Sequence, residues 1–154
     1  MKNLLPKKIL FVCTGNTCRS PMAEGLLKKL AQENGLPLEV QSAGLAAFAG
    51  LPVSPEAVEA CRQKGIDISG HQTQPLGKAL VLESDLILTM TGKHKEMIVK
   101  KMPALEPKVS VLSEMAGEGI VDIEDPVGHP LEVYQGALDQ IEGYLTKSLD
   151  KLRN

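Results

Sequence analysis

The sequence has very few aromatic residues, with two Phe, two Tyr and no Trp in 154 residues. Hydrophobic residues still make up an ordinary 43% of the chain, so a core must be filled mainly by aliphatic side chains. This length is enough to bury such a core and is typical of one domain. We therefore expect a single domain over residues 1–154.

Cysteine is also scarce, with Cys13, Cys18 and Cys61 alone. Three cysteines do not make a disulfide framework, and residues 1–8 are too short and too charged for a secretory signal. We therefore expect a reduced protein in the cytoplasm. Cys13 and Cys18 lack a matching Cys or His pair downstream, so the sequence predicts no metal site. Cys61 lies beside apolar residues of a predicted helix, which indicates packing in the core.

Neither sign of charge dominates, since 17 Lys and Arg oppose 19 Asp and Glu for a net charge of −2. This balance argues against a nucleic-acid partner and against a polybasic membrane patch. The chain also lacks a run of about 18 apolar residues, so no membrane span is expected. The expected oligomeric state is a monomer.

Apolar runs alternate with helical patterns along the chain. This alternation predicts a parallel sheet covered by helices on both faces, a three-layer αβα sandwich. Ligands of such sheets bind beyond the carboxyl ends of the strands. The expected strands are 8–12, 38–42, 85–90 and 109–112, and the expected helices are 21–34, 54–64, 75–82, 91–101 and one from 131 onward.

Two of these helices begin at clear N-cap residues. Ser54 stands before Pro55, which suits the first helical position, and Thr91 precedes the helix that runs to residue 101. The last helix has apolar residues at steps of three and four, which predicts one buried face.

The most informative segment follows the first strand. Cys13 comes directly after the apolar run 9–12, Arg19 and Ser20 follow after five residues, and Pro21 opens a helix. A loop between a strand and a helix N-terminus directs several N–H groups at one point and favours negative charge there. That field stabilises a thiolate, and an arginine can hold two oxygens of a phosphate-like anion. The segment therefore predicts a nucleophile inside an anion cradle.

The arrangement Cys-x5-Arg-Ser in this setting resembles the signature of the low-molecular-weight protein tyrosine phosphatase family, carried by residues 11–24. The resemblance extends to residues 42–44, His71, Asp85 and the Asp125–Pro126 pair, and so covers essentially the whole chain. It implies an α/β fold with a four-stranded parallel sheet of order 2-1-3-4.

The same resemblance implies a mechanism. Cys13 would attack phosphorus and become a phosphocysteine, while Arg19 and the loop N–H groups hold the phosphoryl oxygens. Asp125 would protonate the leaving group and then activate water. No metal or cofactor is implied, because Arg19 and the N–H groups take that role. The other residues expected to hold the phosphoryl group are Thr14, Gly15, Asn16, Thr17, Cys18 and Ser20.

Four polar residues match the family's support network: Asn16, Ser20, Ser42 and His71. By this resemblance, Asn16 and Ser42 hold the loop backbone, and Ser20 donates a hydrogen bond to the Cys13 thiolate. Simpler interpretations stay open. Ser42 can be a strand-end turn residue, and His71 a polar residue beside a helix.

Two further residues also have alternatives. Asp125 precedes a proline in an acidic segment, which is common in ordinary turns. Cys18 either fills the core or forms a reversible disulfide with Cys13 that protects the nucleophile.

The pocket chemistry leaves the substrate open between two phosphorylated side chains. The loop Cys-Thr-Gly-Asn-Thr-Cys-Arg-Ser resembles that of bacterial protein arginine phosphatases, whereas tyrosine-directed members carry a larger aliphatic residue at Thr17. A small hydroxyl leaves room and a polar contact for a phosphoguanidinium group. Val127 stands where animal tyrosine-directed members have a stacking tyrosine, although arginine-type members can carry an aromatic there. Phe48 is the one aromatic expected near the mouth. The favoured substrate is protein phosphoarginine, with phosphotyrosine as the alternative.

Two other functions remain as alternatives. Arsenate reductases share this loop but need a relay of further cysteines, and neither Cys18 nor Cys61 lies where the family keeps it. A phosphate-binding module without catalysis would gain nothing from the reactive set Cys13, Arg19 and Asp125.

Overall fold

A computed structural model of the chain describes residues 7–153, so residues 1–6 and 154 of the predicted domain lie outside the described part. The four strands are β1 (Lys7–Cys13), β2 (Leu38–Gly44), β3 (Leu86–Thr89) and β4 (Val109–Val111). The helices are α1 (Arg19–Asn34), α2 (Pro55–Gln63), α3 (Lys78–Glu83), α4 (Gly92–Lys101), the 3-10 helix η1 (Pro103–Lys108), α5 (Leu112–Met115) and α6 (Leu131–Arg153).

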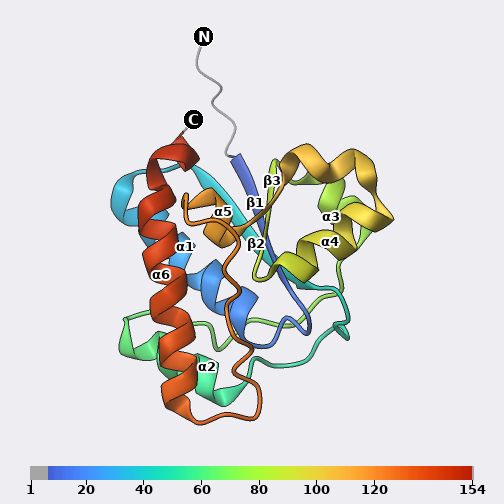
Figure 1. Cartoon of the computed structure of the whole chain (residues 1–154). Coiled ribbons are helices and arrows are strands. Elements are labelled where there is room, and N and C mark those ends of the chain that lie inside the picture. Colours follow the sequence, from blue (N-terminus) through green and yellow to red (C-terminus); the bar gives the residue numbers. More distant parts are fainter. Residues whose placement is uncertain (1–6, 154) are drawn as a thin grey trace.

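The strands form one parallel sheet in the order β2-β1-β3-β4, which confirms the predicted order. Cys13 at the end of β1 lies opposite Gly44 of β2, and the preceding Val12 lies opposite Thr89 of β3. The loops that leave these three strands therefore start at one edge of the sheet, the lower edge in Figure 1.

Helices cover both faces of the sheet, as predicted. Figure 1 shows α1, α2 and α6 on one side and α3 and α4 on the other. β1 contributes to both layers, because successive side chains of a strand point to opposite faces. Ile9 and Phe11 belong to the core under α1 and α6, whereas Leu10 and Val12 pack with Ile98 of α4.

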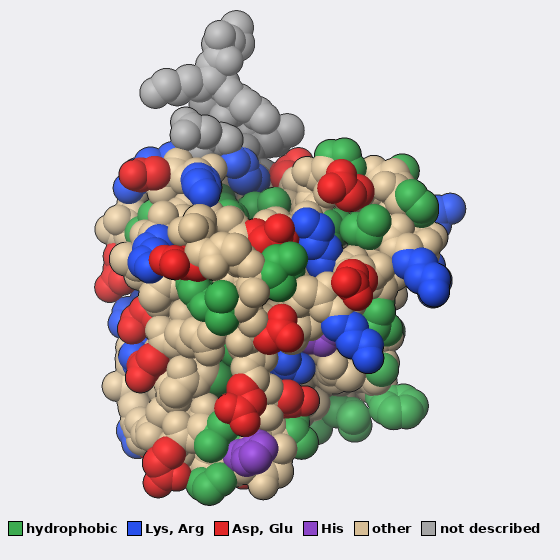
Figure 2. Space-filling view, viewed as in Figure 1, with side chains coloured by type: hydrophobic (Ala, Val, Ile, Leu, Met, Phe, Trp, Pro, Cys, Tyr) green, Lys and Arg blue, Asp and Glu red, His purple; other side chains and the backbone are tan. Residues whose placement is uncertain are grey.

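α6 packs on the body through the predicted apolar stripe. Tyr134, Leu138, Ile141 and Leu145 are buried, and Leu149 is half-buried. No helix in residues 7–153 combines the length and apolar character that crossing a membrane requires. Acidic and basic side chains are interspersed over the face drawn in Figure 2, in keeping with the small net charge.

Some predicted boundaries were wrong. The helix expected over 75–82 begins at Lys78, because Pro75 forms a bridge with Gly44 and the Leu76 N–H donates to the Gly44 carbonyl at 2.9 Å. The fourth strand ends at Val111, since α5 starts at the next residue. Neither η1 nor α5 was predicted. Thr91 is the N-cap of α4, as expected, and its hydroxyl accepts from the His94 N–H at 3.1 Å.

Gly44 lies directly against the loop after β1. A Cβ atom there would lie 2.6 Å from the Thr14 carbonyl oxygen and 2.9 Å from the Asn16 nitrogen. Both are backbone atoms, so the loop or the strand must shift. We predict that Gly44→Ala lowers the unfolding free energy by about 1–3 kcal/mol, measured by urea denaturation.

Gly70→Ala is the matched control, because no atom of residues 7–153 lies within 4 Å of a Cβ at that position. Equal unfolding curves for the two variants would show that β2 does not confine the loop.

Candidate active site

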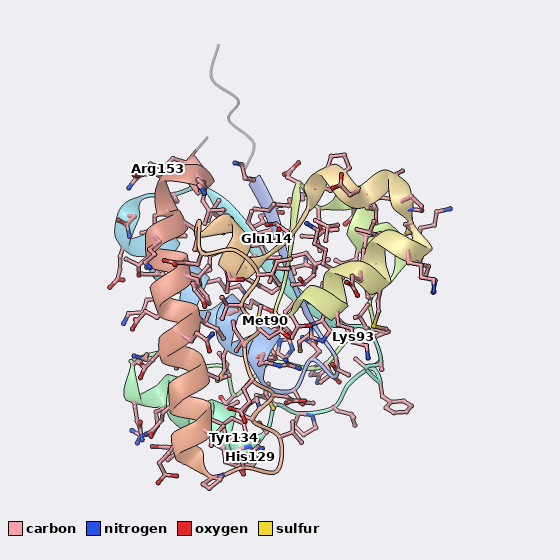
Figure 3. All side chains as sticks on the ribbon, viewed as in Figure 1. Met90, Lys93, Glu114, His129, Tyr134 and Arg153 are labelled. Carbon is pink, nitrogen blue, oxygen red and sulfur yellow. The ribbon has the colours of Figure 1, made fainter. Side chains whose placement is uncertain are left out.

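The loop between β1 and α1 walls a cavity of about 170 Å³. This region lies between the labelled Met90, Lys93 and Tyr134 in Figure 3. The three residues predicted to be catalytic all line this cavity: Cys13 from the end of β1, Arg19 from the start of α1, and Asp125 from the loop before α6. The cavity is small and has eight lining residues. Its lining residues are Cys13, Thr14, Gly15, Thr17, Cys18, Arg19, Asp125 and Val127.

Asn16 holds the loop from inside. It is fully buried, and in residues 7–153 it is the only non-glycine residue with a positive φ, at 58°. Asparagine is among the few residues that tolerate this left-handed conformation. Its Nδ2 donates to Ser20 Oγ at 2.8 Å and to Ser42 Oγ at 2.9 Å. Its Oδ1 accepts from the Gln74 N–H at 3.0 Å and lies 3.0 Å from His71 Nε2, so the amide makes four contacts.

The carbonyl groups of the loop are bonded to neighbouring segments. Leu45 N–H donates to the Cys13 carbonyl at 2.9 Å, Ala46 N–H to that of Thr14 at 2.9 Å, and Ser54 N–H to that of Thr17 at 3.0 Å. These carbonyls are therefore engaged by other segments, and the N-terminus of α1, at Arg19, lies at the wall of the cavity. This is the arrangement that binds phosphate-like anions.

Ser20 lies in direct contact with the Cys13 sulfur. The Cys13 Sγ and Ser20 Oγ atoms are 2.9 Å apart, and both residues are buried. A serine hydroxyl has one proton, and Ser20 Oγ already accepts a hydrogen bond from Asn16. The serine proton is therefore free to be donated to the sulfur.

Arg19 connects the cradle to the acidic loop. Its side chain is buried, and Nη1 donates to the Ile123 carbonyl at 2.9 Å. Its Nη2 lies 3.6 Å from Asp125 Oδ2. The Asp125 side chain is half exposed, at 51%, and its Oδ1 accepts from the Val127 N–H at 3.2 Å. A buried cation and an accessible carboxylate thus form an ion pair at the wall of the cavity.

The predicted support residues form one polar network with two residues that were not predicted as site residues. Ser42 Oγ donates to Glu24 Oε1 at 2.6 Å, and His71 Nδ1 lies 3.7 Å from the same oxygen. Burial lowers the pKa of His71 more than the attraction of Glu24 raises it. Gln74 Nε2 donates to the Ser42 carbonyl at 2.9 Å. Glu24 lies inside the signature segment and could have been found there, whereas Gln74 acts partly through its backbone and leaves no sequence signal.

Cys18 lies between the cavity and the core. Its Sγ lies 3.3 Å from Ser54 Oγ and 3.9 Å from the Tyr134 hydroxyl. Ser54 precedes α2 as predicted, but its hydroxyl does not cap the helix and instead lies 3.3 Å from the Thr17 carbonyl. The three cysteines are free thiols, so the disulfide between Cys13 and Cys18 stays a prediction.

Cys61 is completely buried in the core, and burial raises the pKa of its thiol to about 12. Its expected role in packing is confirmed.

The rim of the cavity carries no aromatic side chain among its lining residues. Phe48, the aromatic expected near the mouth, is 76% exposed and does not line the cavity. Val127 lines it instead. A substrate ring would therefore find no aromatic partner on these walls.

A cysteine and a buried arginine in one anion-binding loop, faced by a carboxylate, define a cysteine-dependent phosphatase. The family model described as low molecular weight phosphotyrosine protein phosphatase matches residues 8–154. The chain belongs to this family, which confirms the resemblance found in the sequence.

Several relatives of known name are similar to almost the whole chain. A protein-arginine-phosphatase of Bacillus subtilis (strain 168) is 39% identical over 145 residues, which cover 94% of this chain and 96% of the relative. A probable low molecular weight protein-tyrosine-phosphatase, EpsP, of Ralstonia nicotianae is 44% identical over 137 residues, covering 88% and 89%. Among solved structures, a mutant of the YwlE arginine phosphatase with a phosphorylated active-site serine has a TM-score of 0.91 and 38% identity, covering 96% of both chains.

The four contacts of the Asn16 side chain make it a strong support of the loop. Asn16→Ala leaves the buried hydroxyls of Ser20 and Ser42 without their donor and places alanine at a positive φ. We predict a loss of about 3 kcal/mol or more in the free energy of unfolding, measured by urea denaturation.

Asn34→Ala serves as the control, because Asn34 makes one exposed bond to the Leu30 carbonyl. A loss at Asn16 no larger than that at Asn34 would contradict the role given to Asn16.

Proposed function

We propose that this chain hydrolyses phosphorylated protein side chains through a phosphocysteine at Cys13, with phosphoarginine as the favoured substrate. The observation that carries the proposal is the Cys13 sulfur, 2.9 Å from a serine hydroxyl whose proton is free to be donated to it, in a cavity shared with Arg19 and Asp125. In a mutant of the YwlE arginine phosphatase, the serine that replaces the active-site cysteine is phosphorylated. This supports a covalent phosphoryl intermediate on Cys13.

In the first step, the Cys13 thiolate attacks phosphorus and the S–P bond forms. The bond between phosphorus and the leaving nitrogen breaks, and Asp125, which enters this step as the carboxylic acid, gives that nitrogen its proton and becomes the carboxylate. Arg19 and the loop N–H groups hold the three phosphoryl oxygens, where positioning and electrostatic stabilisation provide most of the catalysis.

In the second step, water attacks the phosphocysteine. The Asp125 carboxylate takes a proton from this water, the S–P bond breaks, and its electron pair returns to Cys13 as the thiolate. Ser20 stabilises the leaving thiolate through the same short contact that it makes at rest. Inorganic phosphate then leaves the cavity.

Three observations favour phosphoarginine over phosphotyrosine. The walls of the cavity hold no aromatic lining residue on which a phenol ring would stack. Thr17 places a small hydroxyl in the wall, where an aliphatic residue would pack on a ring. The similar Bacillus subtilis protein is named a protein-arginine-phosphatase. Phosphotyrosine remains the alternative, since EpsP is named a probable tyrosine phosphatase.

The expected setting is a monomer in the cytoplasm that acts on phosphorylated proteins. The three cysteines are all free thiols, which suits a reducing compartment.

The substrate assignment is tested by comparing kcat/KM for a phosphoarginine peptide and a matched phosphotyrosine peptide. Wild-type protein should prefer phosphoarginine, and Cys13→Ser supplies the inactive blank. Thr17→Ile should move the ratio of the two constants toward phosphotyrosine by about tenfold or more, because the larger side chain crowds the guanidinium and packs on the ring. Thr146→Ile, an exposed substitution on α6, is the matched control. An unchanged ratio in Thr17→Ile would remove the role given to Thr17.

Asp125→Asn keeps the shape of the side chain but removes its ability to exchange a proton. We expect kcat on the phosphoarginine peptide to fall by about 10²–10⁴-fold. Glu124→Gln, at the neighbouring exposed carboxylate, should stay within about threefold of wild type. Similar losses in the two variants would mean that the general acid is not Asp125.

A further inference from the structure

A buried histidine behind the catalytic loop has no part in the mechanism above. His94, the third residue of α4, is 6% exposed, and its Nε2 lies 3.0 Å from Thr14 Oγ1. Among residues 7–153, its Nδ1 is the only buried side-chain nitrogen or oxygen without a hydrogen-bond partner. The imidazole ring therefore directs its one polar contact at a residue of the cavity wall.

His94 is neutral at physiological pH. Burial and the nearby Arg19 lower its pKa to about 4, against the weaker opposite effects of Asp122 and Asp125. A neutral imidazole has one N–H donor and one acceptor nitrogen. It adds no charge to the anion site, and so its effect on Thr14 is one of orientation.

The contact with His94 leaves the Thr14 hydroxyl an acceptor for the substrate. A threonine hydroxyl has one proton and two lone pairs. If the His94 Nε2 donates, one lone pair and the proton of Thr14 stay free, and if it accepts, both lone pairs stay free. At least one lone pair is available whichever nitrogen carries the proton, while the bond to His94 restricts rotation of the side chain.

Thr14 is exposed and lines the cavity, which puts this residue within reach of the group that carries the phosphoryl. A phosphorylated guanidinium presents several N–H donors to such a wall, whereas the ring of phosphotyrosine presents only C–H groups. A site that provides an oriented acceptor therefore discriminates between these two substrates.

We propose that Thr14 and His94 form a specificity pair, in which the Thr14 hydroxyl accepts an N–H of the substrate guanidinium and His94 is the positioning residue that orients it. The inference rests on the proposed function and names a second determinant of substrate choice beside Thr17.

The surroundings hold His94 in place for this role. The Gly92 N–H at the start of α4 donates to Asp122 Oδ1 at 2.9 Å, which fixes the helix end to the loop that carries Asp125. A rigid supporting residue orients a binding group more closely than a mobile one, because its own rotamer is restricted by packing.

The test measures kcat/KM on the phosphoarginine and phosphotyrosine peptides for single and double variants. Thr14→Val and His94→Phe should each lower the ratio of phosphoarginine to phosphotyrosine kcat/KM by about tenfold. The double variant should lose no more than Thr14→Val alone, because both changes remove one interaction. Thr14→Ser, which keeps the hydroxyl, should keep the ratio within about threefold of wild type.

Val99→Ala is the control for damage to α4, because it removes packing of the same helix against the core and leaves the N-cap bond to His94 unchanged. It should lower the melting temperature and leave the ratio unchanged. A similar fall in the ratio for Val99→Ala, or equal losses on both peptides for Thr14→Val, would overturn the specificity pair and leave a structural role. If the wild-type protein prefers phosphoarginine and Thr14→Val and His94→Phe keep this preference, the specificity pair is overturned and the proposed substrate stands. A wild type without that preference would instead overturn the proposed substrate.

Discussion

The left-handed backbone of Asn16, held by four contacts of its own side chain, is the constraint on which the rest of the site depends. A loop that directs its N–H groups inward must turn sharply, and here a buried asparagine makes that turn at φ 58°. Its amide also orients Ser20 and Ser42, so one side chain sets both the backbone of the cradle and the hydroxyl beside Cys13. The close approach of Gly44 to Thr14 and Asn16 follows from the same tight loop.

A second connection joins this cradle to the loop that carries the carboxylate. Arg19 donates to the Ile123 carbonyl at 2.9 Å, and the Ile123 N–H donates to the Met90 carbonyl at 3.0 Å. The acidic loop is therefore bonded at Ile123 both to the cradle and to the segment after β3. His71 and His94 both have lowered pKa values, so the positive potential of the site comes from Arg19 and the helix N-terminus.

The sequence allowed much of this to be predicted, because the decisive signals are local. The apolar run before Cys13, the spacing to Arg19 and Pro21 together indicated the strand, the cradle and the helix, although α1 begins two residues earlier than predicted, at Arg19. The sheet order and the acidic partner came from the resemblance to a known family. The strand, the loop and the helix can be predicted because each is determined mainly by residues that are neighbours in the sequence.

The features that could not be predicted depend on contacts between distant segments. The Leu76 N–H donates to the Gly44 carbonyl, so α3 begins later in the chain than predicted. The Ser54 hydroxyl donates to the Thr17 carbonyl and therefore does not cap α2. Gln74 contacts Asn16 through a backbone N–H, which any residue except proline would provide. His94 lies eighty residues from its partner Thr14, and nothing in its local sequence shows that the two meet.

The central claim is that Cys13 carries the phosphoryl group of a phosphorylated arginine. The most direct measurement is mass spectrometry of the protein after rapid mixing with a phosphoarginine peptide and a denaturing quench. We predict one added phosphoryl group, located on the peptide that contains Cys13, appearing before inorganic phosphate is released. Phosphate release without any phosphorylated Cys13, or a phosphoryl group on another residue, would contradict this account.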